Sequence, residues 1–247
     1  MYSLIYTLLI IVFLIIIVMI LKKKISPSWV PILNTLLLAL ALYLGYKIYD
    51  SITAPVTFNK IKKERYAKVI ERLKDIRDSE IAMRSILGDY TASFDSLIQF
   101  VDTAKFAITQ QRDSVYKEFN KFLNIWEEKE TVVIDTLGFV SVKDSLFKGS
   151  NRYKEMMWVP IPGREHQVKF KLEKGYVKKG EIKMPVFKAS VQKKDILYDQ
   201  PEDLVAQELQ VVSTEEINGP EIFVGSLDDV STSGNWPKLY DIKDKRK

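Results

Sequence analysis

The first 49 residues contain no aspartate or glutamate, and this charge gap constrains the chain more than any other feature. Two long apolar runs, residues 4–21 and 30–45, lie in it on either side of a lysine cluster at 22–24. About 20 apolar helical residues span the roughly 30 Å hydrocarbon core of a bilayer. The sequence therefore predicts a hairpin of two transmembrane helices over residues 1–50, in contact with the lipid bilayer.

The lysine cluster also predicts the orientation of this hairpin. Short loops that carry lysine stay in the cytoplasm, so the soluble part of the chain should lie outside it. Basic residues at 60–65 favour the opposite orientation, but they precede a long domain, and long domains cross largely regardless of charge. A cleaved signal peptide is the alternative for the first run. It is disfavoured because no basic segment precedes the run and no small-residue cleavage site follows it.

Charge and composition argue against several functions. Neither apolar run contains a charged side chain, which proton- or ion-driven transport usually requires, so both runs are expected to be anchors. After residue 49 the chain carries all 32 acidic and 33 of the 37 basic residues, too even a balance for a nucleic-acid-binding domain. No cysteine is present, which excludes thiolate catalysis and cysteine-ligated metals.

An amphipathic stalk helix is predicted over residues 57–87, after Pro55, which should interrupt the path from the membrane and hold Ala54 extended. Its apolar residues recur at helical spacing on one stripe: Val69, Leu73, Ile76, Met83 and Leu87. Glu80 falls on the same stripe, where an apolar residue is expected. Gly88 should end the helix in the left-handed conformation. We expect the stripe to pack on the chain's own β domain; a coiled coil with another chain is the alternative.

A second, short helix should fold back on the stalk, with Ser93 as its cap. Its apolar residues also have helical spacing: Phe94, Leu97, Ile98 and Val101. The charged residues 110–118 are predicted to continue as a helix toward Trp126. Residues 51–128 thus form a helical region between the membrane hairpin and the rest.

From Thr131 on, apolar and polar residues alternate, which is typical of strands. Residues 131–135 and 139–142 flank a predicted turn at 136–138 and should form a hairpin. Further elements are strands at 156–162, 166–175, 180–191, 196–199 and 221–227 and a helix at 201–212. Residues 129–230 are expected to form a β-rich soluble domain with one wet face. A loose tail, 231–247, should follow, with Trp236 docked on that domain.

The predicted fold class is therefore an α+β membrane protein. It combines two transmembrane helices, a long amphipathic stalk helix and a small, mostly antiparallel β domain.

Two resemblances to known families extend this interpretation. The segment IRDSEIAMRSILGDYTASFDSLIQFV, with Gly88, Tyr90, Phe94 and Leu97, resembles the N-terminal half of type IV pilins and secretion pseudopilins. The chain lacks their cleavage site before the second apolar run, so pilin-like processing is not implied. Four segments make the whole chain similar to an uncharacterised family of two-helix Gram-negative envelope proteins: residues 55–77, 135–149, 224–227 and 234–236. That similarity implies an inner-membrane, multi-pass protein with a periplasmic domain, and no particular activity.

The residue types that carry chemistry form no recognisable site, so no catalytic, cofactor or metal residue is predicted. His166 is the only histidine and should lie on the surface. Three carboxylates, Asp135, Asp144 and Glu165, are too scattered to predict a glycosidase-like pair. Five glycines lack phosphate-loop spacing and are expected in turns: Gly138, Gly149, Gly163, Gly175 and Gly180.

Two other sets of residues have a functional and a structural interpretation. The lysine pairs 178–179 and 193–194 are expected to be solvated surface. Trp126, Trp158 and Trp236 would line a binding groove if they lay together, but packing within the domain is favoured.

The sequence predicts a non-enzymatic envelope protein, anchored in the inner membrane, that acts as an assembly or scaffolding component. It would contact other envelope proteins through its stalk helix, bind no nucleic acid and need no cofactor. The alternative is a membrane-tethered binding module for a cell-envelope ligand such as peptidoglycan.

Overall fold

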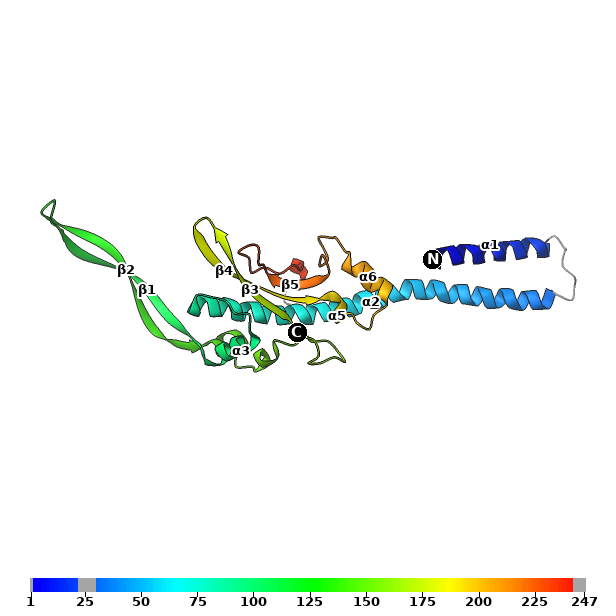
Figure 1. Ribbon diagram of the computed structural model, residues 1–247, viewed down its shortest axis with the longest axis horizontal. Helices are drawn as coiled ribbons and strands as arrows, with labels where there is room; N and C mark the ends of the chain where they lie inside the picture. The colour runs from blue at the N-terminus through cyan, green and yellow to red at the C-terminus, as the bar shows by residue number, and fades with distance from the viewer. Residues whose placement is uncertain (1, 22–29, 242–247) are drawn as a thin grey trace. The chain divides into compact units, whose positions relative to one another are not determined.

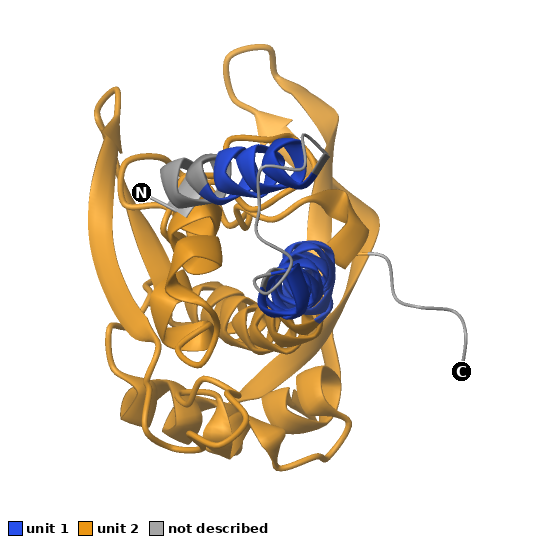
Figure 2. Ribbon diagram, turned by 90° about the vertical axis from the view of Figure 1, so that its right-hand side faces the viewer, with its two compact units in different colours: residues 1–60 blue, residues 61–247 orange. Residues whose placement is uncertain are grey.

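The computed structural model describes residues 2–21 and 30–241, which form an α+β protein with a long apolar N-terminal helix and two small antiparallel sheets (Figure 1). The lysine cluster at 22–24 and the end of the tail, 242–247, lie outside the described residues. The chain divides into two compact units, Met1–Lys60 and Ile61–Lys247 (Figure 2). Both sheets belong to the second unit.

Two helices begin the chain. Helix α1 spans Tyr2–Leu21, and α2 runs without a break from Val30 to Leu87, a length of 58 residues. Among the described residues, α2 is the one helix long and apolar enough, by length and composition, to cross a membrane.

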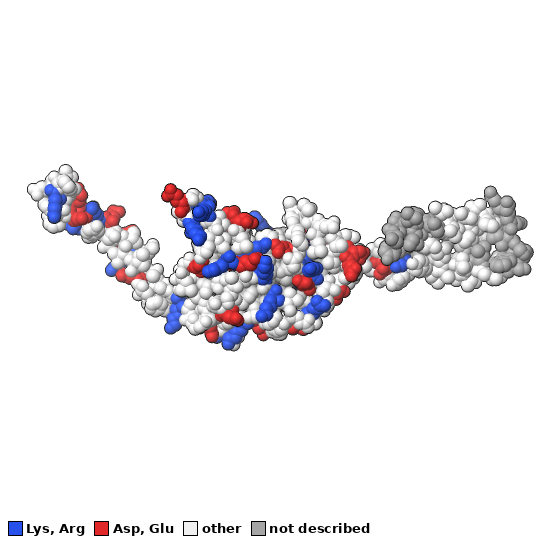
Figure 3. Space-filling view, viewed as in Figure 1, with Lys and Arg blue, Asp and Glu red and all other residues white. Residues whose placement is uncertain are grey.

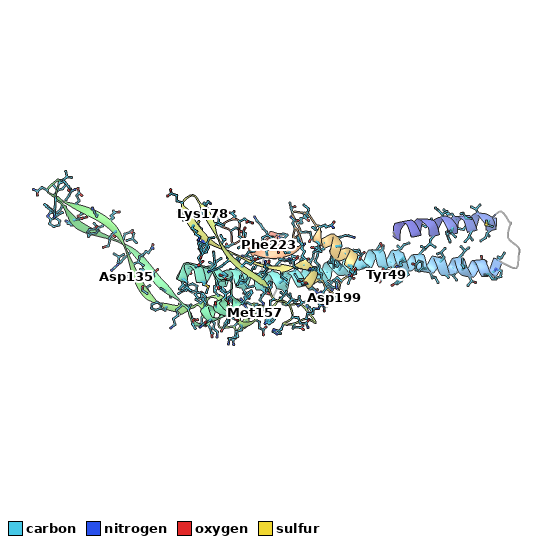
Figure 4. All side chains as sticks on the ribbon, in the orientation of Figure 1. Tyr49, Asp135, Met157, Lys178, Asp199 and Phe223 are labelled. Atoms are coloured by element: carbon cyan, nitrogen blue, oxygen red, sulfur yellow. The ribbon has the colours of Figure 1, made fainter. Side chains whose placement is uncertain are left out.

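Helix α2 continues through Pro55, so the predicted interruption there and the extended conformation at Ala54 are wrong. A proline removes one backbone donor, and the helical turns on both sides outweigh that loss. In the turn before it, Thr53 Oγ1 donates to the carbonyl of Tyr49 at 2.8 Å (Tyr49 is labelled in Figure 4).

The apolar stripe predicted on α2 is buried within the chain itself. Val69, Leu73 and Ile76 have no exposed surface, whereas Leu87, at the end of the stripe, is 63% exposed. The helix ends as predicted, because Gly88 adopts φ +81° and donates its N–H to the carbonyl four residues earlier at 2.8 Å. Met83 is buried as well, so the self-packing interpretation of the stripe is confirmed for its first four positions.

Helix α3 (Phe94–Thr103) follows after a short loop, as the sequence predicts. The Ser93 hydroxyl caps it by accepting the Ser96 N–H at 3.4 Å. Its buried side chains, Leu97, Phe100 and Val101, lie on one side of the helix.

The larger sheet has the antiparallel order β3-β4-β5, with β3 at Lys171–Lys179, β4 at Ile182–Gln192 and β5 at Glu221–Gly225. These strands confirm three of the predicted ones, but β3 begins five residues later than predicted and continues through Gly175, so the turn predicted at that glycine is wrong. Strand β4 departs from the expectation of one wet face. Its adjacent residues Val186 and Phe187 point to opposite faces of the sheet, and both are buried. It is the central strand, and the ring of Tyr90 packs on Phe187 with 4.7 Å between centroids.

The smaller sheet is a two-stranded antiparallel ribbon made of β1 (Lys105–Asn120) and β2 (Ile125–Ser141). The helix predicted through 110–126 is therefore wrong, and so is the turn predicted at 136–138. Ile108 pairs with Gly138 and Thr109 with Thr136, which leaves Leu137 as the extra residue of a β-bulge. A glycine within a strand pattern signals a bulge as well as a turn, and here the turn lies at 121–124.

Short elements complete the second unit: α4 (Val142–Phe147), η2 (Arg152–Glu155), α5 (Lys193–Ile196), α6 (Glu202–Leu209) and η3 (Lys238–Tyr240). Helix α6 confirms the predicted helix at 201–212. The strand predicted at 196–199 is wrong, because α5 and a turn occupy that segment. The strand predicted at 156–162 is reduced to one bridge between Trp158 and Lys169, since its two prolines cannot donate to a ladder. In the tail, Trp236 is buried as predicted.

Candidate interaction surface

The side chains singled out in the sequence lie at separate places on the fold. His166 is exposed, as predicted, with its ring edge-on to Trp158 at 5.5 Å. Trp126 is exposed on β2, whereas Trp236 is buried in the tail. The tryptophans thus belong to three different elements, and the groove interpretation gains no support.

The three scattered carboxylates each make a local contact. Asp135 Oδ2 pairs with Arg112 Nε at 3.1 Å on the ribbon (Figure 4). Asp144 lies in the first turn of α4, and Glu165 Oε1 accepts the Gly163 N–H at 3.2 Å. Across residues 2–21 and 30–241, no group of three or more His, Asp or Glu side chains is placed to hold a metal ion.

The β1–β2 ribbon presents an uncovered apolar face. Residues directly opposite in an antiparallel pair lie on the same face, and faces alternate along each strand. By this rule one face, called the apolar face below, carries six apolar side chains that are each between 39% and 68% exposed: Val115, Phe119, Trp126, Val132, Ile134 and Phe139. Phe119 and Trp126 are direct partners, with ring centroids 5.2 Å apart.

The opposite face of the ribbon is more polar in its middle, although it also carries Tyr116 and, toward the ends, Ile108 and Ile125, each between 45% and 49% exposed. Its cross-strand partners include Ser114 with Thr131 and Glu118 with Glu127. Lys129 Nζ lies 2.5 Å from Glu118 Oε2 and relieves the repulsion between the two glutamates. Such pairs hold the two strands together, but they bury no apolar surface.

The ribbon therefore has the properties of a protein-binding surface. A two-stranded hairpin is marginally stable in water unless its apolar face is covered, and large exposed apolar patches mark interaction sites. Basic and acidic side chains are interspersed along the ribbon in Figure 3, with uncharged surface between them. At the turn, Phe122 extends the apolar surface and is 99% exposed.

The apolar face also has a charge preference. It carries three acidic residues, Asp113, Glu128 and Glu130, and two basic ones, Lys105 at its base and Lys117, which pairs with Glu128 at 3.4 Å. Asp113 and Glu130 lie diagonally across the two strands beside Val115 and Val132. A complementary partner surface would thus be apolar and rimmed by basic side chains.

A buried charge network fixes α2 to the C-terminal part of the second unit. Glu208 accepts hydrogen bonds from Lys193 Nζ at 2.9 Å, Lys62 Nζ at 2.9 Å and the Tyr66 hydroxyl at 3.2 Å. Burial alone would lower the pKa of Lys62, but its contacts with Glu208 and Glu216 outweigh burial and raise it. This network is structural, since its polar atoms are occupied by one another.

The prediction that Lys193 is a solvated surface residue is wrong. Its side chain is completely buried, and Nζ also donates to the carbonyls of Ile217 at 2.5 Å and Glu208 at 3.2 Å. Its neighbour Lys194 is exposed as predicted.

Beside this network, Arg65 forms a two-pronged ion pair with Asp199 at 2.6 and 2.8 Å (Asp199 is labelled in Figure 4). The hydrogen bond from Arg65 lowers the pKa of Asp199 to about 2. Arg65 also donates to the carbonyl of Ile196 at 2.8 Å, so it ties α2 to α5.

Glu80 is a buried acidic residue. The sequence already showed its position on the apolar stripe to be unusual. Its Oε2 accepts the Thr91 N–H at 3.1 Å, while Oε1 is buried without a hydrogen-bond partner in the part of the chain that the structure describes. Burial raises the pKa of Glu80 to about 8, against the opposing effects of the Thr91 hydrogen bond and Lys174. The carboxyl group is therefore largely protonated at neutral pH.

In comparisons with known proteins, no family model matches the chain, and neither a curated protein nor a solved structure does.

Proposed function

We propose that this chain is a non-enzymatic, membrane-anchored envelope protein that acts as an assembly or scaffolding component. In this proposal α1 and the first part of α2 are the two membrane helices, the second unit lies in the periplasm, and the apolar face of the ribbon binds another envelope protein. The proposal is based on one observation: among the described residues, no part of the chain covers the apolar face of the β1–β2 ribbon.

The stalk helix is a less suitable partner surface than the sequence indicated. Its stripe residues Val69, Leu73 and Ile76 are already buried, so a partner would have to displace the chain's own core. The ribbon needs no such rearrangement. We therefore assign the partner contact to the apolar face, with a partner that offers apolar side chains rimmed by lysine or arginine.

Site-specific photo-crosslinking of the full chain in its native membranes tests this proposal. A photoreactive residue at Ile134, on the apolar face, should give one recurrent protein adduct. The same residue at Gln110, on the polar face and equally part of the ribbon, is the matched control and should not. Equal adducts at both positions, or none at Ile134, would contradict the proposed surface.

Charge reversal on the ribbon sharpens the test. Glu130→Lys should reduce the Ile134 adduct, because it opposes a basic partner rim, whereas Glu127→Lys on the polar face should not. Adducts to peptidoglycan alone would favour the alternative function, a tethered binding module for a cell-envelope ligand.

A further inference from the structure

We propose that the free edge of β1 pairs with β1 of a second copy of this chain, antiparallel and about a twofold axis at Val115. The result is a four-stranded sheet with the order β2-β1-β1-β2. This inference goes beyond the proposed function, because it concerns the free edge of β1 and not the apolar face, and its evidence is the residue pattern of β1. In the described residues, β1 pairs with β2 alone, so its other edge carries unpaired backbone groups that template strand addition.

The charges of β1 are self-complementary about Val115. With Val115 opposite its own copy, Asp113 faces Lys117 of the second copy and Arg112 faces Glu118 of the second copy. The symmetry repeats each contact, giving four opposite-charge pairs. Directly opposite residues of unlike charge stabilise an antiparallel pair, whereas like charges destabilise it.

The register with its axis at Val115 is more favourable than the registers centred on the adjacent residues. An axis at Asp113 or at Lys117 places two like charges directly opposite each other. An axis at Ser114 or at Tyr116 forms no opposite-charge pair between the strands. A shift to an axis between two residues would place the apolar face of one ribbon beside the polar face of the other, since side chains alternate with a period of two.

The intrachain ion pairs extend this pattern across the sheet. Lys117 already pairs with Glu128 on β2 at 3.4 Å, so in the dimer it lies between Glu128 and Asp113 of the second copy. Arg112 likewise lies between Asp135 and Glu118 of the second copy. The apolar face doubles in width, and the marginal two-stranded ribbon becomes part of a four-stranded sheet.

The opposite edge, on β2, is a poorer site for self-pairing. It contains the bulge at Leu137, and bulges interrupt strand pairing at edges. It also carries the run Glu127, Glu128, Lys129 and Glu130, in which an axis at Lys129 would bring like charges together.

Cysteine crosslinking of the full chain in membranes tests the axis directly, because the sequence has no cysteine of its own. Val115→Cys should form a disulfide-linked dimer under mild oxidation. Val132→Cys is the matched control, on the same face and similarly exposed. In the proposed sheet its two copies lie three strand spacings apart across the sheet and four residues apart along it, about 20 Å in all, so it should not crosslink.

A charge-swap pair tests the register. In the Val115→Cys background, Asp113→Lys places lysine opposite lysine, and Lys117→Asp places aspartate opposite aspartate. Each alone should lower the dimer yield about tenfold. Mixing the two variant chains should restore it, because both contacts of the mixed dimer are then complementary.

The outcomes separate the two proposals. Equal crosslinking of Val115→Cys and Val132→Cys, no crosslinking at Val115→Cys, or variants that the charge swap leaves unaffected would each overturn the twofold β1 dimer. The Ile134 adduct to another protein is independent of that result, so the proposed function stands or fails by its own experiment.

Discussion

Lys193 Nζ lies 2.9 Å from Glu208 Oε1, and neither side chain is more than 3% exposed. The same carboxylate accepts from Lys62 on α2 at 2.9 Å. Each charge in this group is compensated by another, so a single deletion leaves its partners buried and unbalanced. Removing one partner of a buried ion pair costs more than the intact pair contributes.

Replacing Lys193 by methionine should therefore destabilise the second unit strongly. We expect a loss of about 3–5 kcal/mol, since Glu208 would keep one lysine and two backbone carbonyls would lose their donor. Lys194→Met is the matched control because Lys194 is adjacent and exposed; its effect should stay below about 0.5 kcal/mol. Urea denaturation followed by circular dichroism measures both, and equal effects would contradict the buried network.

Glu80 should make the stability of the protein fall as pH rises. Its carboxyl has a pKa of about 8 in the folded state and an ordinary value of 4.5. Between these values the unfolded chain releases a proton that the folded chain keeps, so the free energy of unfolding falls by at most about 1.4 kcal/mol per pH unit. Glu80→Gln should flatten that slope. Glu64→Gln, on the exposed side of α2, should not.

Residues 56–247, separated from the apolar N-terminal part, should fold and remain in solution. The fragment contains the whole second unit with its buried core. Cooperative thermal unfolding, followed by circular dichroism, is the expected result. A featureless, disordered spectrum would show that the unit depends on the N-terminal helices.

Leu73→Ala in this fragment should cost about 2–5 kcal/mol, the usual range for a buried leucine. Leu73 has no exposed surface, whereas Leu87 on the same sequence stripe is mostly exposed. Leu87→Ala should therefore change the melting temperature little. An unchanged melting temperature in Leu73→Ala would mean that the stripe does not support the fold and serves another chain.

The proposed orientation predicts a thiol-labelling pattern. Cysteine at Ser150 should react with an impermeant reagent in cells whose outer membrane is opened and whose inner membrane is intact. Cysteine at Ser26, beside the lysine cluster, should not react, because lysine-bearing short loops stay in the cytoplasm. Labelling at Ser26 without labelling at Ser150 would reverse the proposed topology.

The elements that the sequence predicted well are those with a strong local period. The stripe at Val69, Leu73 and Ile76, the cap at Ser93 and the strands at β3 and β4 all follow from spacing alone. Strand β1 was not predicted, because it lacks such a period. Its charged residues are exposed on both faces, so no apolar alternation distinguishes a free ribbon from a solvated helix.

The burial of charged side chains could not be predicted from local sequence alone. Lys193 resembles any solvated lysine until the fold brings Glu208 and the carbonyl of Ile217 to it. Glu80 was different, because the sequence already showed it on a stripe where an apolar residue is expected. The sequence could not show its hydrogen bonding, because the Thr91 N–H that bonds Oε2 comes from the following loop, and Oε1 has no partner among the described residues.

The separation of Lys62 and Glu208 along the chain has a consequence for biosynthesis. The two residues are 146 positions apart, so at about 5–20 residues per second the ribosome makes Glu208 roughly 7–30 s after Lys62. Once α2 is complete and has left the ribosome, it carries a lysine that must later be buried and an apolar stripe that is not yet covered. The core of the second unit can therefore close only after most of the chain has been made, because the carboxylate that Lys62 needs comes near its end.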